Sequence, residues 1–153
     1  MPNYKGHLVG GVVGFGIVIF LCSLHVAPCT KLVEWLLFVV AGSLFPDIDT
    51  KSKGQKIFYI LLSVAMIFFA VQKQFKVVAG CAFMGMLPLL SNHRGIFHHF
   101  WFILGLVVVA VVCLSSLYPF ARERIVYDAA FFVLGVMSHL YLDVGLRRML
   151  RIS

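Results

Sequence analysis

The chain has 153 residues, of which 61% are hydrophobic and only 12% are charged. Its mean hydropathy is +1.00. Because a soluble domain carries about 25% charged residues, this composition excludes a soluble globular protein. A net charge of +7 would suggest nucleic-acid binding in a soluble protein. Here the cations lie in short segments between long apolar stretches, where membrane topology accounts for them, and we expect no nucleic-acid partner.

Apolar stretches recur along the whole chain, at residues 8–27, 32–46, 57–71, 77–90, 97–119 and 125–142. We expect an all-α integral membrane protein, a bundle of about five to six transmembrane helices that forms a single domain over residues 1–153. Several stretches are shorter than the roughly 20 residues that a spanning helix prefers, so about four full spans with re-entrant segments are an alternative. In the first stretch His7, Gly10, Gly11 and Gly14 share one face, which we expect to pack inward.

The cations between the stretches predict the orientation in the membrane. With six spans, one side holds eight cations and the other side holds five. Because cytoplasmic loops carry the excess of Lys and Arg, both termini should be cytoplasmic. The first side holds Lys5, Lys51, Lys53, Lys56, Arg94, Arg147, Arg148 and Arg151, and the second holds Lys31, Lys73, Lys76, Arg122 and Arg124.

Histidines and aspartates gather near the ends of the apolar stretches. In the six-span topology they all fall at the same membrane face, although that topology rests on hydropathy and cation bias alone. Such a cluster predicts a functional site. Its members are His7, Asp47 and Asp49 in FPDIDT, His93, His98 and His99 in HRGIFHH, and His139 and Asp143 in SHLYLD.

The spacing of these residues suits metal binding. His139 and Asp143 are four residues apart, so they should project from one face of a helix. Asp47 and Asp49 alternate after Pro46, and in an extended segment they could reach one ion or bridge two. Imidazole and carboxylate ligands together favour zinc, with manganese or magnesium as alternatives, as one or two ions. A plain His–carboxylate pair or a turn explains each pair equally well when it is taken alone.

The residues between the fourth and fifth stretches add to this picture. His98 and His99 point in different directions, so at most one of them should be a primary ligand. Arg94 lies between ligand candidates, and its planar guanidinium suits a phosphate or a carboxylate. We expect Arg94 to contact either a substrate or a ligand aspartate.

The ordered motifs resemble the YdjM-like family of bacterial inner-membrane proteins, to which metal-dependent hydrolase activity is ascribed by prediction. They are His-x-x-x-Gly, Pro-Asp-Ile-Asp with a downstream Ser, His-Arg-Gly-x-x-His, and Ser-His-Leu-x-x-Asp. The resemblance covers nearly the whole chain and departs from the family at Phe97 and His99, where Thr and Ser are common. It implies functional roles for His7, Asp47, Asp49, Ser52, His93, Arg94, His98, His139 and Asp143.

These observations favour a membrane-embedded metal-dependent hydrolase that acts at the cytoplasmic interface. The metal ligands would be His7, Asp47, Asp49, His93, His98, His139 and Asp143. Asp49 could act as general base, and Arg94 would stabilise developing negative charge. The depth of the site favours an amphiphilic substrate, such as a lipid phosphoester. Alternatives are a non-enzymatic metal carrier or sensor, and a structural or partner-binding protein in which these groups only hydrogen-bond to one another.

Overall fold

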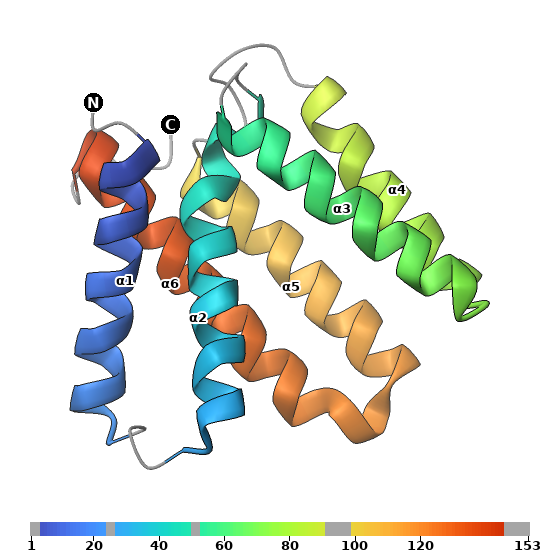
Figure 1. Cartoon of the computed structure of the whole chain (residues 1–153), viewed down its shortest axis with the longest axis horizontal. Coiled ribbons are helices and arrows are strands. Elements are labelled where there is room, and N and C mark those ends of the chain that lie inside the picture. Colours follow the sequence, from blue (N-terminus) through green and yellow to red (C-terminus); the bar gives the residue numbers. More distant parts are fainter. Residues whose placement is uncertain (1–3, 24–26, 50–52, 91–98, 146–153) are drawn as a thin grey trace.

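A computed structural model describes residues 4–23, 27–49, 53–90 and 99–145. Within these ranges the chain forms six α-helices and two short 3-10 helices, and it contains no strand (Figure 1). The predicted all-α architecture is therefore confirmed. The α-helices are α1 (Tyr4–Leu21), α2 (Cys29–Leu44), α3 (Lys53–Val71), α4 (Phe75–Leu90), α5 (Phe100–Leu117) and α6 (Arg122–Val144), and the 3-10 helices are η2 (Phe45–Asp49) and η4 (Pro119–Ala121).

Each predicted apolar stretch corresponds to one helix. The first stretch was expected to reach residue 27, but α1 ends at Leu21. Two residues later Ser23 has a φ of 53°, which lies in the left-handed region and cannot continue a helix. The apolar run continues past the end of the helix. Hydropathy alone could not locate that end, because it does not register a change of backbone conformation.

Three segments are long and apolar enough to cross a membrane, namely Cys29–Ile48, Phe100–Leu117 and Pro119–Asp143. Two further apolar helical segments, Lys5–Leu21 and Gln55–Val71, are shorter. Large apolar side chains such as Phe20, Val71 and Phe120 are exposed on the outside of the bundle. A surface of this kind is stable in lipid and not in water. The chain is therefore an all-α membrane protein.

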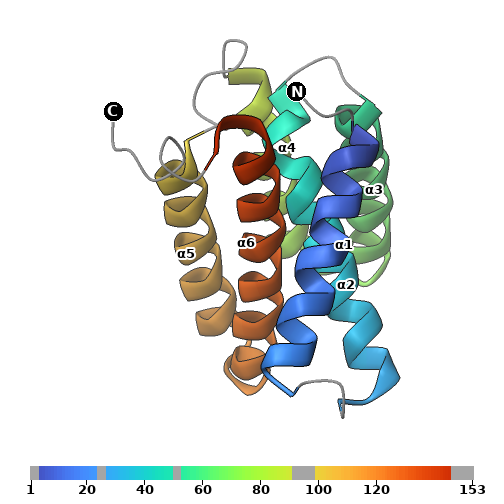
Figure 2. The same cartoon turned by 90° about the vertical axis from the view of Figure 1, so that its left-hand side faces the viewer.

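The helices alternate in direction along the bundle. α1 begins, α2 ends, α4 ends, α5 begins and α6 ends at one end of the molecule (Figures 1 and 2). The turn from α3 to α4 and the start of α6 lie at the opposite end (Figure 1). This arrangement brings segments that are far apart in the sequence to a common end of the bundle.

The closest helix pair is α2 with α6, and two glycines make this close approach possible. A Cβ atom added at Gly42 would collide with the carbonyl oxygen of Phe132, and one added at Gly135 would collide with the carbonyl oxygen of Val39. The two backbones are thus in direct contact, as small residues allow between helices in lipid. The sequence analysis did not single out this glycine pair.

Replacement of Gly42 by Ala should force α2 and α6 apart. We expect a loss of stability of about 1–3 kcal/mol, the usual cost of overpacking a well-packed interface. Thermal unfolding in detergent would measure it. Gly105→Ala is the matched control, because a Cβ at Gly105 meets nothing within 4 Å and Ala is the better helix former by about 1 kcal/mol. Equal midpoints for the two variants would contradict the close contact.

Helix α1 packs through part of its predicted glycine face. A Cβ at Gly11 would lie 3.2 Å from the Cβ of Ser43 on α2, and a Cβ at Gly10 would press on Leu142 of α6. The prediction was wrong for Gly14, where a Cβ would meet nothing within 4 Å. Only the first half of the glycine face therefore makes close contact, and this is the half that carries His7.

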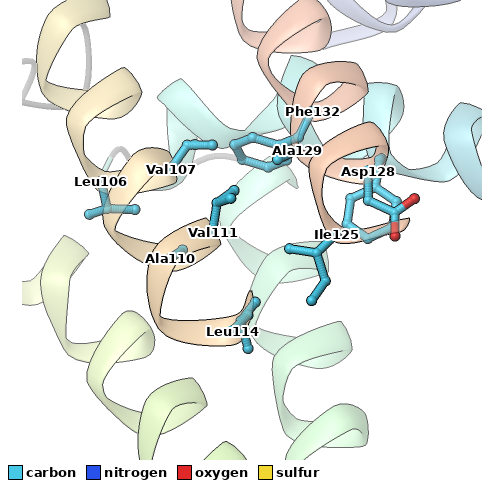
Figure 3. A pocket seen from close by; sticks show the side chains of 10 residues that line it. Leu106, Val107, Ala110, Val111, Leu114, Ile125, Asp128, Ala129 and Phe132 are labelled. Atoms are coloured by element: carbon cyan, nitrogen blue, oxygen red, sulfur yellow. The ribbon is translucent and has the colours of Figure 1, made fainter. Parts of the chain in front are cut away.

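An apolar groove lies between α2, α5 and α6 (Figure 3). Its volume is about 210 Å³. Asp128 borders the groove, but its carboxylate points away from Val111 and Leu114 (Figure 3). The groove is lined by Phe38, Leu106, Val107, Ala110, Val111, Leu114, Ile125, Asp128, Ala129 and Phe132.

Candidate functional site

His139 is the centre of a buried polar cluster near the end of α6. Its side chain is completely buried, and Gly135, one turn earlier, brings this part of α6 onto the backbone of α2. Nδ1 of His139 lies 2.7 Å from the carbonyl oxygen of Ser43. Because a carbonyl oxygen can only accept, Nδ1 carries the proton and donates it. Nε2 is therefore the ring nitrogen that carries the lone pair.

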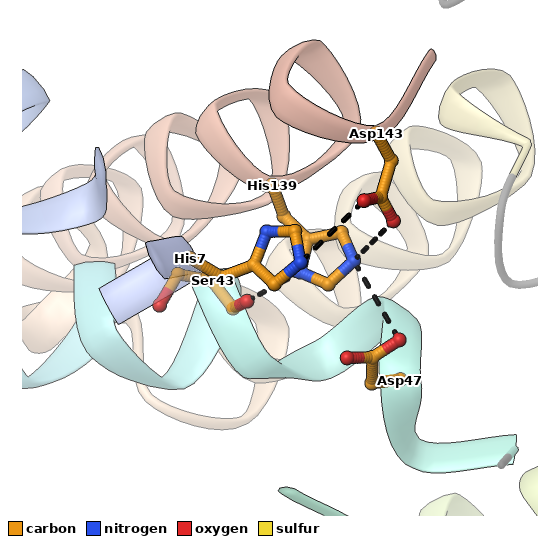
Figure 4. Close-up of polar contacts among 5 residues, drawn as sticks. All are labelled: His7, Ser43, Asp47, His139 and Asp143. Carbon is orange, nitrogen blue, oxygen red and sulfur yellow. Dashed lines mark hydrogen bonds and ion pairs between the residues drawn. The ribbon is translucent and has the colours of Figure 1, made fainter. Parts of the chain in front are cut away.

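Two carboxylates approach Nε2 of His139 (Figure 4). Oδ2 of Asp143, one turn further along α6, lies 3.2 Å away, and Oδ1 of Asp47 in η2 lies 3.7 Å away. The Asp143 side chain is almost fully buried, whereas that of Asp47 is 26% exposed. The cluster thus reaches the surface on the Asp47 side.

His7, in the first turns of α1, completes the cluster from the opposite side. Its ring stacks on that of His139, with ring centroids 3.8 Å apart and 17° between the planes. Its Nε2 lies 3.5 Å from Oδ1 of Asp143, so each oxygen of this carboxylate faces a different imidazole. Nδ1 of His7 is buried and has no hydrogen-bond partner among the described residues.

The local structure of η2 sets the position of Asp47. Pro46 follows Phe45 and favours a break in the α-helical hydrogen bonding, and the chain tightens from α2 into the 3-10 helix Phe45–Asp49. The carbonyl oxygen of Ile48 accepts a hydrogen bond of 2.9 Å from Nε2 of Gln55 on α3. Helix α3 therefore holds the segment that presents Asp47.

Ligand atoms of His7, Asp47 and His139 all lie within 4.8 Å of one another. For ligand atoms about 2.0–2.1 Å from a tetrahedral zinc ion, neighbouring atoms are about 3.3–3.4 Å apart. The nitrogen–oxygen distances of 3.2, 3.5 and 3.7 Å in the cluster bracket this spacing. The donor types and their separations therefore suit a divalent metal ion, which His7, Asp47 and His139 could hold.

A scan against protein families matches residues 1–148 to the YdjM inner membrane protein family. The chain belongs to this family. The match confirms the resemblance found in the sequence and assigns an inner-membrane location. Comparisons with curated proteins and with solved structures gave no match. Membership in the YdjM family therefore identifies the kind of protein, and the chemistry has to be argued from the site itself.

Four of the predicted site residues of this YdjM-family chain come together, from α1, η2 and α6. They are His7, Asp47, His139 and Asp143. The side chain of Asp49 and all of Ser52, His93, Arg94 and His98 lie outside the described residues. His99 is described; it is exposed at the N-terminal cap of α5.

One expectation about the aspartates was wrong. Asp47 and Asp49 were expected to alternate in an extended segment, but the backbone there is a 3-10 helix. Residues two apart in a helix of three residues per turn lie about 120° apart around its axis. The position of Asp47 in the cluster therefore does not carry over to Asp49.

Ser43 and the two contact glycines are the site features that sequence reasoning missed. Ser43 contributes its main-chain oxygen to the site. Any residue type would supply that oxygen, so the serine in the sequence does not indicate the contact. Gly42 and Gly135 could have been noticed, because they lie one or two turns from Asp47 and His139. Small residues near a polar cluster are a signal for close helix packing.

A second polar group lies near the opposite end of the bundle. Nε of Arg124 contacts Oε1 of Glu34 at 2.5 Å, and Oδ2 of Asp128 is 4.0 Å away. Arg124 is mostly exposed, and these contacts pair α2 with α6 where both helices begin. One guanidinium lies between two carboxylates here, and this group resembles a structural ion-pair network.

Proposed function

We propose that this chain is a membrane-embedded, metal-dependent hydrolase. His7, Asp47, His139 and Asp143 would hold one or two divalent ions, with zinc as the first choice and manganese or magnesium as alternatives. The observation that carries this proposal is the hydrogen bond from Nδ1 of His139 to the carbonyl oxygen of Ser43. Metal-binding histidines commonly donate the second ring N–H to such an oxygen, which fixes the tautomer and orients the ring.

The electrostatics of the cluster support a cation at its centre. With Nδ1 protonated, neutral His139 points its Nε2 lone pair toward two carboxylates, and a cation between these groups would be attracted by all three. A proton on each imidazole would place two positive rings in a stack 3.8 Å apart, where they would repel one another. One divalent ion instead balances the two carboxylate charges without that repulsion.

The ring stack bears on the number of ions. Nitrogen lone pairs lie in the ring planes, so two nearly parallel rings direct them side by side and not to one point. Each imidazole faces its own oxygen of Asp143. His7 and His139 would therefore each offer a nitrogen beside Asp143, and both one ion and two ions stay part of the proposal.

The proposed chemistry is hydrolysis of an amphiphilic substrate at the membrane interface. A bound divalent ion supplies an activated water and polarises the bond to be cleaved. The buried walls around His7 and His139 exclude bulk water, and the partly exposed side at Asp47 leaves a way in. Asp49 as general base and Arg94 as the group that stabilises developing charge remain part of the proposal.

The orientation is also proposed. Lys5 and Lys56 lie at the site end, whereas Lys73 and Lys76 flank the turn at the opposite end. In the six-span topology drawn from the sequence, eight cations fall on the side of the site and five on the other, so we propose that this side is cytoplasmic. The site would then open to the inner leaflet of the inner membrane.

Transport of the ion is less well supported than hydrolysis. A carrier needs polar groups through the middle of the bilayer. Between the His–Asp cluster and the Arg124 group, the described interior contains an apolar cluster of Trp35, Val39 and Phe131. This apolar layer separates the two polar ends.

The decisive test is metal content combined with activity. We expect protein purified in mild detergent without chelator to contain one or two equivalents of a divalent metal, measured by mass spectrometry. A chelator should abolish hydrolysis of phosphoester probes, and added zinc or manganese should restore it. A folded, metal-free protein whose activity ignores chelators would refute the proposal. Full metal content without hydrolysis of any phosphoester, ester or amide probe would support the carrier or sensor instead.

A further inference from the structure

We propose that Gln55 is a positioning residue of the His–Asp cluster, which holds Asp47 beside His139 through the main chain of Ile48. The consequence for metal binding rests on the hydrolase proposed above, whereas the position of Asp47 does not. Helix α3 in this way governs the affinity of the centre for its ion, although none of the four described ligands lies on α3.

Asp47 is held differently from the other three residues of the cluster. His7 lies on α1, and His139 and Asp143 lie on α6, two long helices that pack against each other and against α2. Asp47 lies instead in η2, a 3-10 helix of five residues, and its side chain is the most exposed of the four. The position of Asp47 therefore depends on the contacts that fix η2.

Helix α3 contacts η2 on both sides of Asp47. Before Asp47, the ring of Phe45 packs edge-on against that of Phe58 on α3, with centroids 6.1 Å apart and 76° between the planes. After Asp47, the carbonyl oxygen of Ile48 accepts the 2.9 Å hydrogen bond from Nε2 of Gln55. Gln55 and Phe58 are three residues apart, so they lie on one face of α3. One face of α3 therefore fixes η2 at two points.

The 3-10 conformation connects these two contacts to the direction of Asp47. Phe45 and Ile48 are three residues apart, which is one turn of a 3-10 helix, so both lie on the face that is buried in the core. Asp47 lies about 120° away around the axis, and its carboxylate points toward His139 (Figure 4). While the buried face is fixed, η2 cannot rotate, and Asp47 keeps its direction.

The hydrogen bond from Gln55 is the more exacting of the two contacts. Aromatic rings stay in favourable contact over centroid distances of about 4.5–7 Å, whereas an N–H···O hydrogen bond needs about 2.7–3.2 Å. The side chains that form a metal centre have to be held to within about 0.5 Å. The hydrogen bond therefore provides the precision that Asp47 needs as a ligand, and the contact of Phe45 with Phe58 does not.

The same hydrogen bond would be purely structural if it only joined η2 to the start of α3. Its two residues are seven apart in the sequence, and such a bond stabilises the connection whatever Asp47 does. The two roles differ in one measurable respect. A structural bond affects stability alone, whereas a positioning bond affects the affinity of the folded protein for metal, and does so only while Asp47 is a ligand.

Gln55→Met tests the inference in the whole protein, purified in mild detergent. Met has a similar length but no hydrogen-bond donor. We expect zinc to bind about 10–100-fold more weakly, the usual loss when a group that supports a metal ligand is removed, as measured by competition with a zinc-chelating dye. In an Asp47→Asn background the same substitution should cause no further loss, because the ligand on which it acts is absent.

Tyr59→Phe is the matched control on the same helix. The hydroxyl of Tyr59 also donates to a main-chain carbonyl in a partly buried place, that of Gly85 on α4 at 3.0 Å. We expect this variant to lower the unfolding midpoint about as much as Gln55→Met does and to leave the zinc affinity unchanged. Equal losses of zinc affinity in the two variants, no loss in Gln55→Met, or a full further loss in the Asp47→Asn background would overturn the inference.

A measurement without metal separates this inference from the hydrolase. In chelated, isotope-labelled protein, the nitrogen-15 chemical shift of Nε2 of His139 reports on the groups around that atom. Gln55→Met should change this shift, because Asp47 moves, and Tyr59→Phe should not. A changed shift in a protein that binds no zinc would support the positioning of Asp47 and refute the hydrolase. Zinc binding with an unchanged shift would overturn the inference and leave the hydrolase standing.

Discussion

Asp143→Asn should empty the metal centre while the fold survives. Asp143 is the residue whose two carboxylate oxygens face both imidazoles, at 3.2 and 3.5 Å. Loss of a group that merely supports a metal ligand costs about 10–100-fold in affinity, so loss of this shared carboxylate should cost more. We expect bound metal to disappear from the purified protein and hydrolysis to disappear with it, as mass spectrometry and phosphoester assays would show.

The variant is chosen so that folding remains intact. The Asn side chain has the same shape as Asp, and its amide can donate a hydrogen bond to the lone pair of Nε2 of His139. Asp128→Asn is the matched control, because Asp128 is also a buried acid on α6 but lies in the opposite polar group. Normal metal content in Asp143→Asn would contradict the metal centre. The cluster would then be a structural group held together by hydrogen bonds.

Removal of the metal should also lower the thermal stability of the protein. A ligand at a hundredfold excess over its Kd stabilises the folded state by about 2.7 kcal/mol. For a chain of about 150 residues this corresponds to about 5–10 °C in the unfolding midpoint. We expect EDTA to lower the midpoint by this amount and zinc to restore it, as measured by thermal unfolding in detergent.

The same measurement on two histidine variants shows where the effect originates. His139→Ala removes a fully buried ring of the cluster and should abolish the response to EDTA and zinc. His99→Ala removes an exposed ring at the start of α5 and should keep the full response. If His139→Ala is destabilised but chelator has no effect on the unaltered protein, the cluster is structural and holds no metal.

Much of this site could be predicted from the sequence, because membrane helices have few arrangements. Hydropathy marks six apolar stretches, and six helices that alternate in direction bring the start of α1 and the end of α6 to one face. The helical repeat then places His139 and Asp143 together. These two regularities explain why His7, Asp47, His139 and Asp143 are among the residues that the sequence predicts to be neighbours.

The features that could not be predicted are those of the backbone. Hydropathy does not encode the 3-10 conformation of η2, which buries Phe45 and Ile48 in the interior. The carbonyl of Ser43 reaches His139 only because Gly42 and Gly135 let two main chains touch. Gly14 shows the opposite failure, since a favourable spacing in the sequence meets no neighbouring helix.

The alternation of the six described helices has a practical consequence for cell experiments. α1 starts and α6 finishes beside the His–Asp cluster (Figure 1). A folding reporter fused after Val144, where α6 ends, would therefore test in living cells whether the opening of the site faces the cytoplasm, as we propose.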